Sequence, residues 1–241
     1  FFTNLSNELK TPLSRIIAPI SQLLPSTEEV HEKQTLEEVQ RNAMKINSLI
    51  HQVLNFNRIE DNKDSLLILS RIELVSFSRS LFSVYEEDKR FTFHFEANKA
   101  KIYADMDAIK LGVILDNLLS NAVKFTSEGG SIRLSLFYRQ ETGLLEICVS
   151  DTGAGIPQQD IPYIFQRFFQ SPHSGSKEGT GIGLYLVKTY TELHGGHING
   201  VTSNEGKGTS IGLNIPVIAV EKEEIPATQV KKQLESLPVL K

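Results

Sequence analysis

The sequence is poor in the features that mark several common protein classes. Its 241 residues include one cysteine, Cys148, and no tryptophan, which excludes a disulfide framework and a zinc site built from cysteines. No apolar run approaches the roughly 18 residues of a membrane-spanning helix, and nothing resembles a signal peptide. The formal net charge is -4 and no long block of Lys and Arg occurs, so we expect no direct contact with nucleic acid or a membrane surface.

What the sequence has is material for a folded core. Hydrophobic residues make up 40% and charged residues 22%, which is typical of a globular protein of one or two domains. The chain starts without methionine inside a helical pattern. We therefore expect a soluble fragment of a longer protein.

Residues 1–62 show the periodicity of two amphipathic helices joined by a short loop. Apolar or helix-compatible positions recur at steps of three and four along both segments: Phe2, Leu5, Leu9, Pro12, Ile16, Pro19 and Leu23 in the first, and Leu36, Val39, Ala43, Ile46, Ile50 and Val53 in the second. A single hairpin cannot cover so wide an apolar face. We therefore predict a homodimer in which two hairpins form a four-helix bundle.

Residues 63–216 have a different pattern. Alternating apolar residues predict one strand pair over 131–138 and 145–149, and a second over 197–203 and 209–215. Helical patterns cover 107–124 and 183–194. The predicted fold class is α+β, with helices on one face of a mixed or mainly antiparallel sheet. Residues 217–241 are charged and punctuated by proline, which predicts a linker.

Four segments of this second domain suggest chemistry on a nucleotide. In "DNLLSNAVKF", Asn117, Asn121 and Lys124 share one helical face, where amide oxygens suit Mg²⁺ and the ammonium suits phosphate. "DTGAGIP" places Asp151 in a glycine-containing loop. "GTGIGL" sets bare amides at the start of a helix, and "IFQRFF" offers the guanidinium of Arg167.

In chain order, the segments "DNLLSNAVKF", "DTGAGIP", "IFQRFF" and "GTGIGL" resemble the N, G1, F and G2 boxes of the sensor histidine kinases of two-component systems. The "FFTNLSNELKTPL" stretch resembles their H box. The resemblance covers residues 1 to about 216. It implies a HisKA-like dimerisation and histidine-phosphotransfer hairpin over 1–62 and a HATPase_c-like ATP-binding domain of the Bergerat (GHKL) fold over 63–216.

The resemblance also implies a role for each matching residue. Asn121 and Asn117 would hold Mg²⁺ at the ATP phosphates, Lys124 would contact phosphate, and Asp151 would accept from the adenine amino group. Arg167 would stabilise charge during phosphoryl transfer. The remaining nucleotide-binding positions implied are Phe125, Gly153, Gly155, Ile156, Gly179, Thr180, Gly181, Gly183 and Leu184, of which the last five end the ATP lid.

The H box departs from the family at its central position. The family has a histidine followed by an acid, and the ring nitrogen attacks the γ-phosphate; here Asn7 precedes Glu8. The amide nitrogen lone pair is delocalised into the carbonyl, so Asn7 cannot take the phosphoryl group. We therefore predict ATP binding without autophosphorylation. Thr11 matches the threonine that positions water against a phospho-aspartate of the response-regulator receiver domain.

Autophosphorylation of this chain would need another histidine to serve as the phosphoryl acceptor in place of Asn7. His31 is followed by Glu32 and has Thr35 at H-box spacing, but it lies about 25 Å further along the predicted bundle. The other histidines are not followed by an acid. Asn7 is therefore either an engineered substitution or the mark of a naturally degenerate kinase.

Three readings of the whole chain stay open at this stage. The first is the catalytic core of a bacterial sensor kinase, cytoplasmic and anchored to a membrane elsewhere, with a receiver domain as partner. The second is a non-enzymatic, nucleotide-gated dimeric scaffold. The third, an ATPase of the chaperone or repair type, fits less well because those proteins lack an H-box hairpin. The terminal "SLPVLK" resembles the entry into a fused receiver domain.

Overall fold

The computed structural model describes residues 67–172 and 180–217, together with Ile16, Ile20, Leu36, Val39, Ala43 and Ile46. The chain divides into two compact units, Phe1–Asp64 and Ser65–Lys241. All six described residues of the first unit are helical. Ile20 and Ala43 are buried, whereas the side chains of Ile16, Val39 and Ile46 are exposed.

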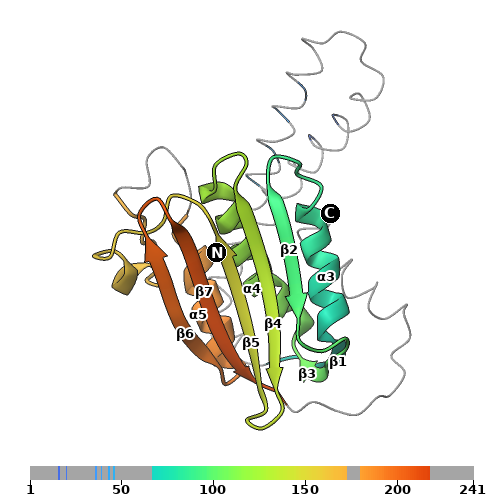
Figure 1. Cartoon of the computed structure of the whole chain (residues 1–241). Helices are drawn as coiled ribbons and strands as arrows, with labels where there is room; N and C mark the ends of the chain where they lie inside the picture. Colours follow the sequence, from blue (N-terminus) through green and yellow to red (C-terminus); the bar gives the residue numbers. More distant parts are fainter. Residues whose placement is uncertain are drawn as a thin grey trace. The chain divides into compact units, whose positions relative to one another are not determined.

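The second unit is a mixed α/β domain (Figure 1). Its described elements, in chain order, are β1 (Ser70–Glu73), α3 (Leu74–Tyr85), β2 (Thr92–Ala97), β3 (Tyr103–Met106), α4 (Ala108–Phe125), β4 (Ser131–Arg139), β5 (Leu144–Asp151), the short 3₁₀ helix η2 (Ile161–Tyr163), α5 (Gly183–Leu193), β6 (His197–Asn204) and β7 (Gly208–Pro216). The expected α+β fold class is confirmed.

Five strands form the main sheet in the order β2-β4-β5-β7-β6. β2 runs parallel to β4, and the other neighbours are antiparallel. β1 and β3 pair separately as a two-stranded sheet. The helices α3, α4 and α5 lie against one face of the main sheet (Figure 1), so the opposite face is left uncovered by helices among the described residues.

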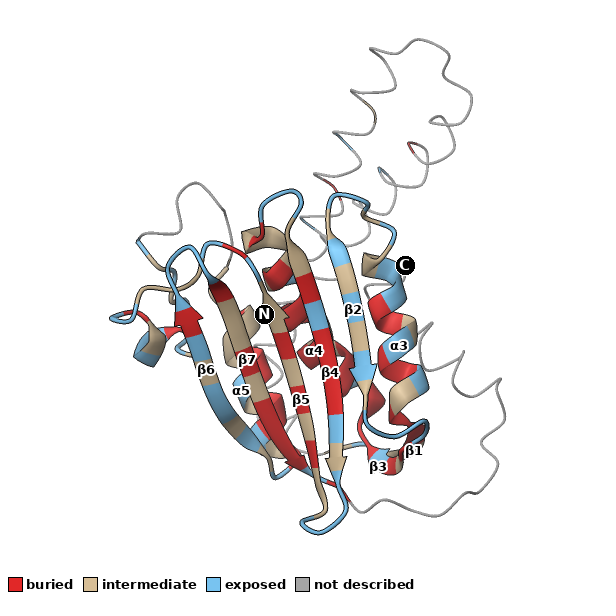
Figure 2. Ribbon diagram, viewed as in Figure 1, coloured by how far each residue is buried: buried red, intermediate tan, exposed pale blue. Residues whose placement is uncertain are grey.

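The core forms where the alternating apolar residues of the sheet meet these helices. Figure 2 shows buried positions along all three central strands, and the buried apolar residues among them recur at every second residue. Every member of this row is less than one-tenth exposed: Ile132, Leu134, Leu136, Leu145, Ile147, Val149, Ile211, Leu213 and Ile215. A period of two puts one side of each strand in the core. The same side carries Asp151, a predicted site residue, at the end of β5.

The helix α4 begins at a side-chain cap and runs across this core. The Asp107 carboxylate accepts a hydrogen bond from the Lys110 amide at 3.0 Å, which satisfies one of the free amides of the first turn. Leu111, Ile114 and Leu118 are buried on the core side. Apolar burial therefore fixes the rotation of α4, and with it the direction of its polar residues.

None of the described helices is long and apolar enough to cross a membrane.

Candidate nucleotide-binding site

The polar face of α4 meets the start of α5. Asn117 is buried, and its amide Nδ2 donates to the Val113 carbonyl at 2.8 Å. Its Oδ1 lies so close to Gly183 that a Cβ there would approach it to 2.6 Å. Asn121 and Lys124 follow on the next turns and are half-buried. A glycine at the first residue of α5 thus lets the carboxamide of α4 lie beside the helix end.

The first turn of α5 presents amides that no side chain caps. Ile182 is the N-cap residue and makes no side-chain cap bond, so the amides that follow at Gly183 and Leu184 are of the kind that face anions. Thr180 Oγ1 accepts from the Ile182 amide at 3.3 Å. The phosphate binding predicted for "GTGIGL" depends on uncapped amides of this kind.

Asp151 ends β5 and opens the predicted base-recognition loop. Its Oδ1 accepts from the amides of Gly153 at 2.8 Å and Thr209 at 3.3 Å. Burial raises the pKa of the carboxyl, and these two amide bonds offset part of that effect. Among the described residues, no protein donor contacts Oδ2 of Asp151. That oxygen is free to accept from a ligand.

The Asp151 loop packs closely on the end of α4. The Ala154 amide donates to the Phe125 carbonyl at 3.1 Å, and a Cβ on Gly153 would approach the same carbonyl to 2.5 Å. Only glycine fits there without displacing backbone. The Lys124 ammonium lies 4.7 Å from the centre of the Phe125 ring. Residues 124–125 and 151–154 therefore form one corner of the site.

The turn between β6 and β7 also packs against this loop, which no sequence motif predicted. Gly155 has φ of 75°, and a Cβ on it would approach the Asn204 carbonyl to 2.1 Å. The Gly206 amide donates to Ala154 O at 2.7 Å, and the Ile156 amide to Ser203 Oγ at 2.7 Å. The β6–β7 turn, read above only as a hairpin connection, is thus part of the site. Local sequence gives no signal for this packing.

The "IFQRFF" segment is hydrogen-bonded to the start of the "GIGL" segment. The Phe168 amide donates to Gly181 O at 3.0 Å, and both residues have positive φ, 61° and 70°. The Arg167 guanidinium is exposed and lies 4.9 Å from the centre of the Tyr185 ring. The Arg167 guanidinium therefore lies against Tyr185 in the first turn of α5, the turn that carries the uncapped amides.

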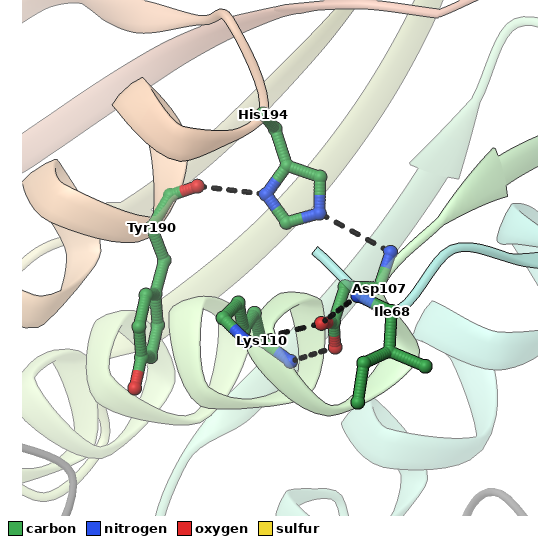
Figure 3. Close-up of polar contacts among 5 residues, drawn as sticks. All are labelled: Ile68, Asp107, Lys110, Tyr190 and His194. Atoms are coloured by element: carbon green, nitrogen blue, oxygen red, sulfur yellow. Dashed lines mark hydrogen bonds and ion pairs between the residues drawn. The ribbon is translucent and has the colours of Figure 1, made fainter. Parts of the chain in front are cut away.

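A buried polar cluster holds the far ends of α4 and α5 together (Figure 3). Asp107 Oδ2 accepts from Lys110 Nζ at 3.1 Å and from the Ile68 amide at 3.0 Å. His194 Nε2 accepts from the Asp107 amide at 3.2 Å, and its Nδ1 donates to the Tyr190 carbonyl at 2.7 Å. Both ring nitrogens of His194 are thus engaged inside the fold. No local sequence pattern predicts this cluster, because its members are far apart in the chain.

Several predicted site residues lie outside the described part of the chain. They are Asn7, Glu8, Thr11 and the alternative acceptor His31, and also residues 173–179 of the predicted lid "SPHSGSKEGTGIGL", which include Gly179. The predicted linker beyond residue 217 lies outside it as well. The described residues include no group of three or more His, Cys, Asp or Glu side chains that could hold a metal ion.

Comparisons with known families match both units. Residues 1–62 match the His Kinase A (phospho-acceptor) domain, and residues 106–219 match the histidine kinase-, DNA gyrase B- and HSP90-like ATPase family. The chain belongs to the sensor histidine kinases of two-component systems. The resemblance drawn from the boxes is therefore confirmed at the level of the family.

Individual relatives agree with this assignment. Histidine kinase P4 of Formosa agariphila is 31% identical over 261 residues, covering 100% of this chain and 19% of that protein. The solved structure of full-length ShkA in complex with AMPPNP matches with a TM-score of 0.70 at 24% identity, over 91% of this chain and 46% of ShkA. ThkA in complex with the response regulator TrrA matches with a TM-score of 0.60 at 20% identity, over 91% and 62%. This histidine kinase chain spans a minor part of its curated relatives.

Proposed function

We propose that this histidine kinase core binds ATP with Mg²⁺ and does not phosphorylate itself, because Asn7 occupies the acceptor position. The observation that carries the nucleotide site is the placement of three features along α4. The Asn117 carboxamide lies beside the uncapped start of α5 at Gly183, and the loop of the Asp151 carboxylate, which has one oxygen left for a ligand, packs on the end of α4. Each suits a different part of an adenine nucleotide.

The proposed roles follow the chemistry of each group. Asp151 Oδ2 accepts from the adenine amino group, with Phe125 and Ile156 beside the base. The amides at the start of α5 and the cations Lys124 and Arg167 face the phosphates. The lid segment that contributes to phosphate binding includes Gly179, Thr180, Gly181, Gly183 and Leu184.

The residues present fit a magnesium ion of the kind that nucleotides carry. Mg²⁺ keeps several waters and binds through few protein oxygens together with phosphates, so it needs no cage of carboxylates, and none is present among the described residues. The carboxamide oxygens of Asn121 and Asn117 are neutral hard donors on one helical face. When bound, the ion would neutralise phosphate charge.

The acceptor position decides whether the family reaction can be completed. In the family a histidine takes the γ-phosphoryl group and passes it to an aspartate of a response regulator, and Asn7 lacks the nucleophilic nitrogen needed for this. His194 is buried with both ring nitrogens engaged, so it is no substitute. The second candidate function is a nucleotide-gated dimeric scaffold that acts without phosphoryl transfer. The asparagine at position 7 favours this scaffold function, because it cannot take the phosphoryl group.

We further propose that the chain works inside the cell as a homodimer, as part of a membrane-anchored sensor. Ile16, Val39 and Ile46 expose apolar side chains on a helical unit, which favours burial against a second copy. The complex of ThkA with TrrA supports a receiver domain as the partner. Thr11 would position water for dephosphorylation of that receiver. An unchanged rate in Thr11→Ala would rule this role out.

Nucleotide binding with and without Mg²⁺ tests the proposed site. We expect ADP to bind more tightly with Mg²⁺, and Asn121→Ala to remove most of that gain, about tenfold in affinity. Ser120→Ala, an exposed neighbour on the same helix, is the matched control and should bind as the unchanged chain does. An Asn121→Ala variant that keeps the full Mg²⁺ effect would contradict the metal assignment.

A further inference from the structure

Ser203 lies at the junction of the segments that surround Asp151. Its side chain is 4% exposed. Its hydroxyl accepts from the Ile156 amide at 2.7 Å, donates to the Gly208 carbonyl at 3.0 Å, and lies 2.9 Å from Thr209 Oγ1. One buried hydroxyl thus joins the Asp151 loop to both sides of the β6–β7 turn.

The strand register places Ser203 in line with Asp151. Asp151 is opposite Thr209 in the β5–β7 pair, and Thr209 is opposite Ser203 in the β6–β7 pair. Side chains of directly opposite residues in antiparallel strands point to the same face. Asp151, Thr209 and Ser203 therefore form a row across three strands on the face that also carries Val149 and Ile211 toward the helices.

A count of protons gives this row a direction. A serine hydroxyl has one proton and two lone pairs. If Ser203 donates its proton to Gly208 and accepts from Ile156, its contact with Thr209 is a hydrogen bond only when Thr209 donates. This arrangement makes all three bonds at once, as is usual for buried polar groups. The proton of Thr209 is then used, and its oxygen can only accept from another group.

We propose that Ser203 is a positioning residue that sets base specificity by holding the Thr209 proton away from the ligand. Asp151 is an acceptor when ionised, so the row offers acceptors from two adjacent side chains, Asp151 and Thr209. This arrangement favours a purine with an amino group at position 6, which donates, over one with an oxo group, which accepts. The inference rests on the proposed binding of an adenine nucleotide at Asp151.

Removing the Ser203 hydroxyl has a defined effect on this arrangement. In Ser203→Ala the Thr209 proton loses its acceptor and can turn toward the ligand, where it meets an oxo group favourably. The preference for amino purines over oxo purines should therefore fall. A loss of fold stability alone would not change this preference. Thr209→Val removes the Thr209 hydroxyl itself and changes the size of the side chain little. It leaves the Ser203 bonds to Ile156 and Gly208 in place.

The test compares the affinities of ADP and inosine diphosphate, which differ in the group at position 6, by calorimetry. The unchanged chain should prefer ADP. Ser203→Ala and Thr209→Val should each lower the ADP preference by about fivefold, the value of one hydrogen bond. The double variant should match Thr209→Val alone, because both changes act through one oxygen. Ser210→Ala, on the opposite face beside Cys148, should keep the preference.

Each remaining outcome overturns the inference. If Ser203→Ala weakens both nucleotides equally, the residue has a structural role only. If Ser203→Ala does not fold, Thr209→Val decides, and an unchanged preference in that variant ends the proposal. Binding of ADP without any preference over inosine diphosphate also contradicts it. Failure of the unchanged chain to bind either nucleotide would instead refute the proposed function, and this inference with it.

Discussion

Asp151 divides its two carboxylate oxygens between the protein and the proposed ligand. Oδ1 accepts from two backbone amides, which orient the group. We therefore expect Asp151→Asn to weaken ADP binding about tenfold to a hundredfold, since a hydrogen bond to a charged group contributes about 1.5–3 kcal/mol. Calorimetry measures the affinity, and Asp105→Asn, an exposed residue of β3, is the control. Equal affinities of the two variants would contradict the role of Asp151.

The same residue predicts a pH dependence of binding. Burial raises the pKa of Asp151 above the ordinary value of 3.8, and a protonated carboxyl loses its acceptor charge. ADP affinity should therefore fall, as pH is lowered, at a higher pH than an ordinary aspartate would give. Asp151→Asn carries the same phosphate titration and should lack this step. A step of equal size in both proteins would assign it to another group.

At the scale of elements, the Asp107 cluster joins α4, α5 and the segment that leads into β1. Asp107→Ala removes the cap of α4 and one partner of a buried ion pair with Lys110. We expect the free energy of unfolding to fall by at least about 3 kcal/mol, measured by urea denaturation. Asp107→Asn keeps a capping oxygen and should lose less. A loss below about 1 kcal/mol for the alanine variant would show that the cluster does not hold the helices.

His194 makes the contact between α4 and α5, and with it the free energy of unfolding, sensitive to acid. Burial lowers its pKa below 6.5, and only the neutral ring can accept from the Asp107 amide. Between the folded and unfolded pKa values the unfolded chain binds more protons, so the free energy of unfolding rises with pH. The contribution of His194 is complete above about pH 6.5 and is lost as the pH falls toward the folded pKa.

Urea unfolding at pH 7.5 and 5.5 measures this effect. The chain should lose more stability on acidification than His194→Gln, which has a polar side chain that does not titrate in this range. The other histidines are common to both proteins and cancel in the comparison. Equal losses would mean that His194 does not couple protonation to folding.

The elements show which parts of the fold are encoded locally. The strands of the β4–β5 and β6–β7 pairs follow from patterns over five or more residues, and α4 follows from its helical period. The short strands β1 and β3 have four residues each, too few for a clear period. The parallel pairing of β2 with β4 joins strands separated by two other elements, so no local pattern predicts it.

The residues of the candidate site likewise fall into those that local motifs predict and those that only the assembled sheet brings together. Asp151, Asn117 and the start of α5 are recognisable because each motif is contiguous in sequence. Ser203 and Thr209 enter through strand register and through the packing of a turn on Gly155, which depend on the assembled sheet. The predicted roles of the individual nucleotide-binding residues remain predictions until binding is measured.

At the scale of the whole molecule, two units with different tasks share one chain. Residues 106–219 match the ATPase family and carry the proposed nucleotide site, and residues 1–62 match the family's phospho-acceptor domain, with Asn7 at the proposed acceptor position. A change at one residue can therefore silence transfer while the nucleotide site stays intact. This separation predicts that restoring the acceptor alone restores the reaction.

Autophosphorylation with γ-labelled ATP and Mg²⁺ tests this claim most directly, comparing the chain with Asn7→His alongside ATP-analogue binding for both. We predict that both proteins bind the analogue and that only Asn7→His takes up label. Label on the unchanged chain would contradict it by revealing another acceptor. Binding by both with label on neither would also contradict it and would favour the nucleotide-gated scaffold.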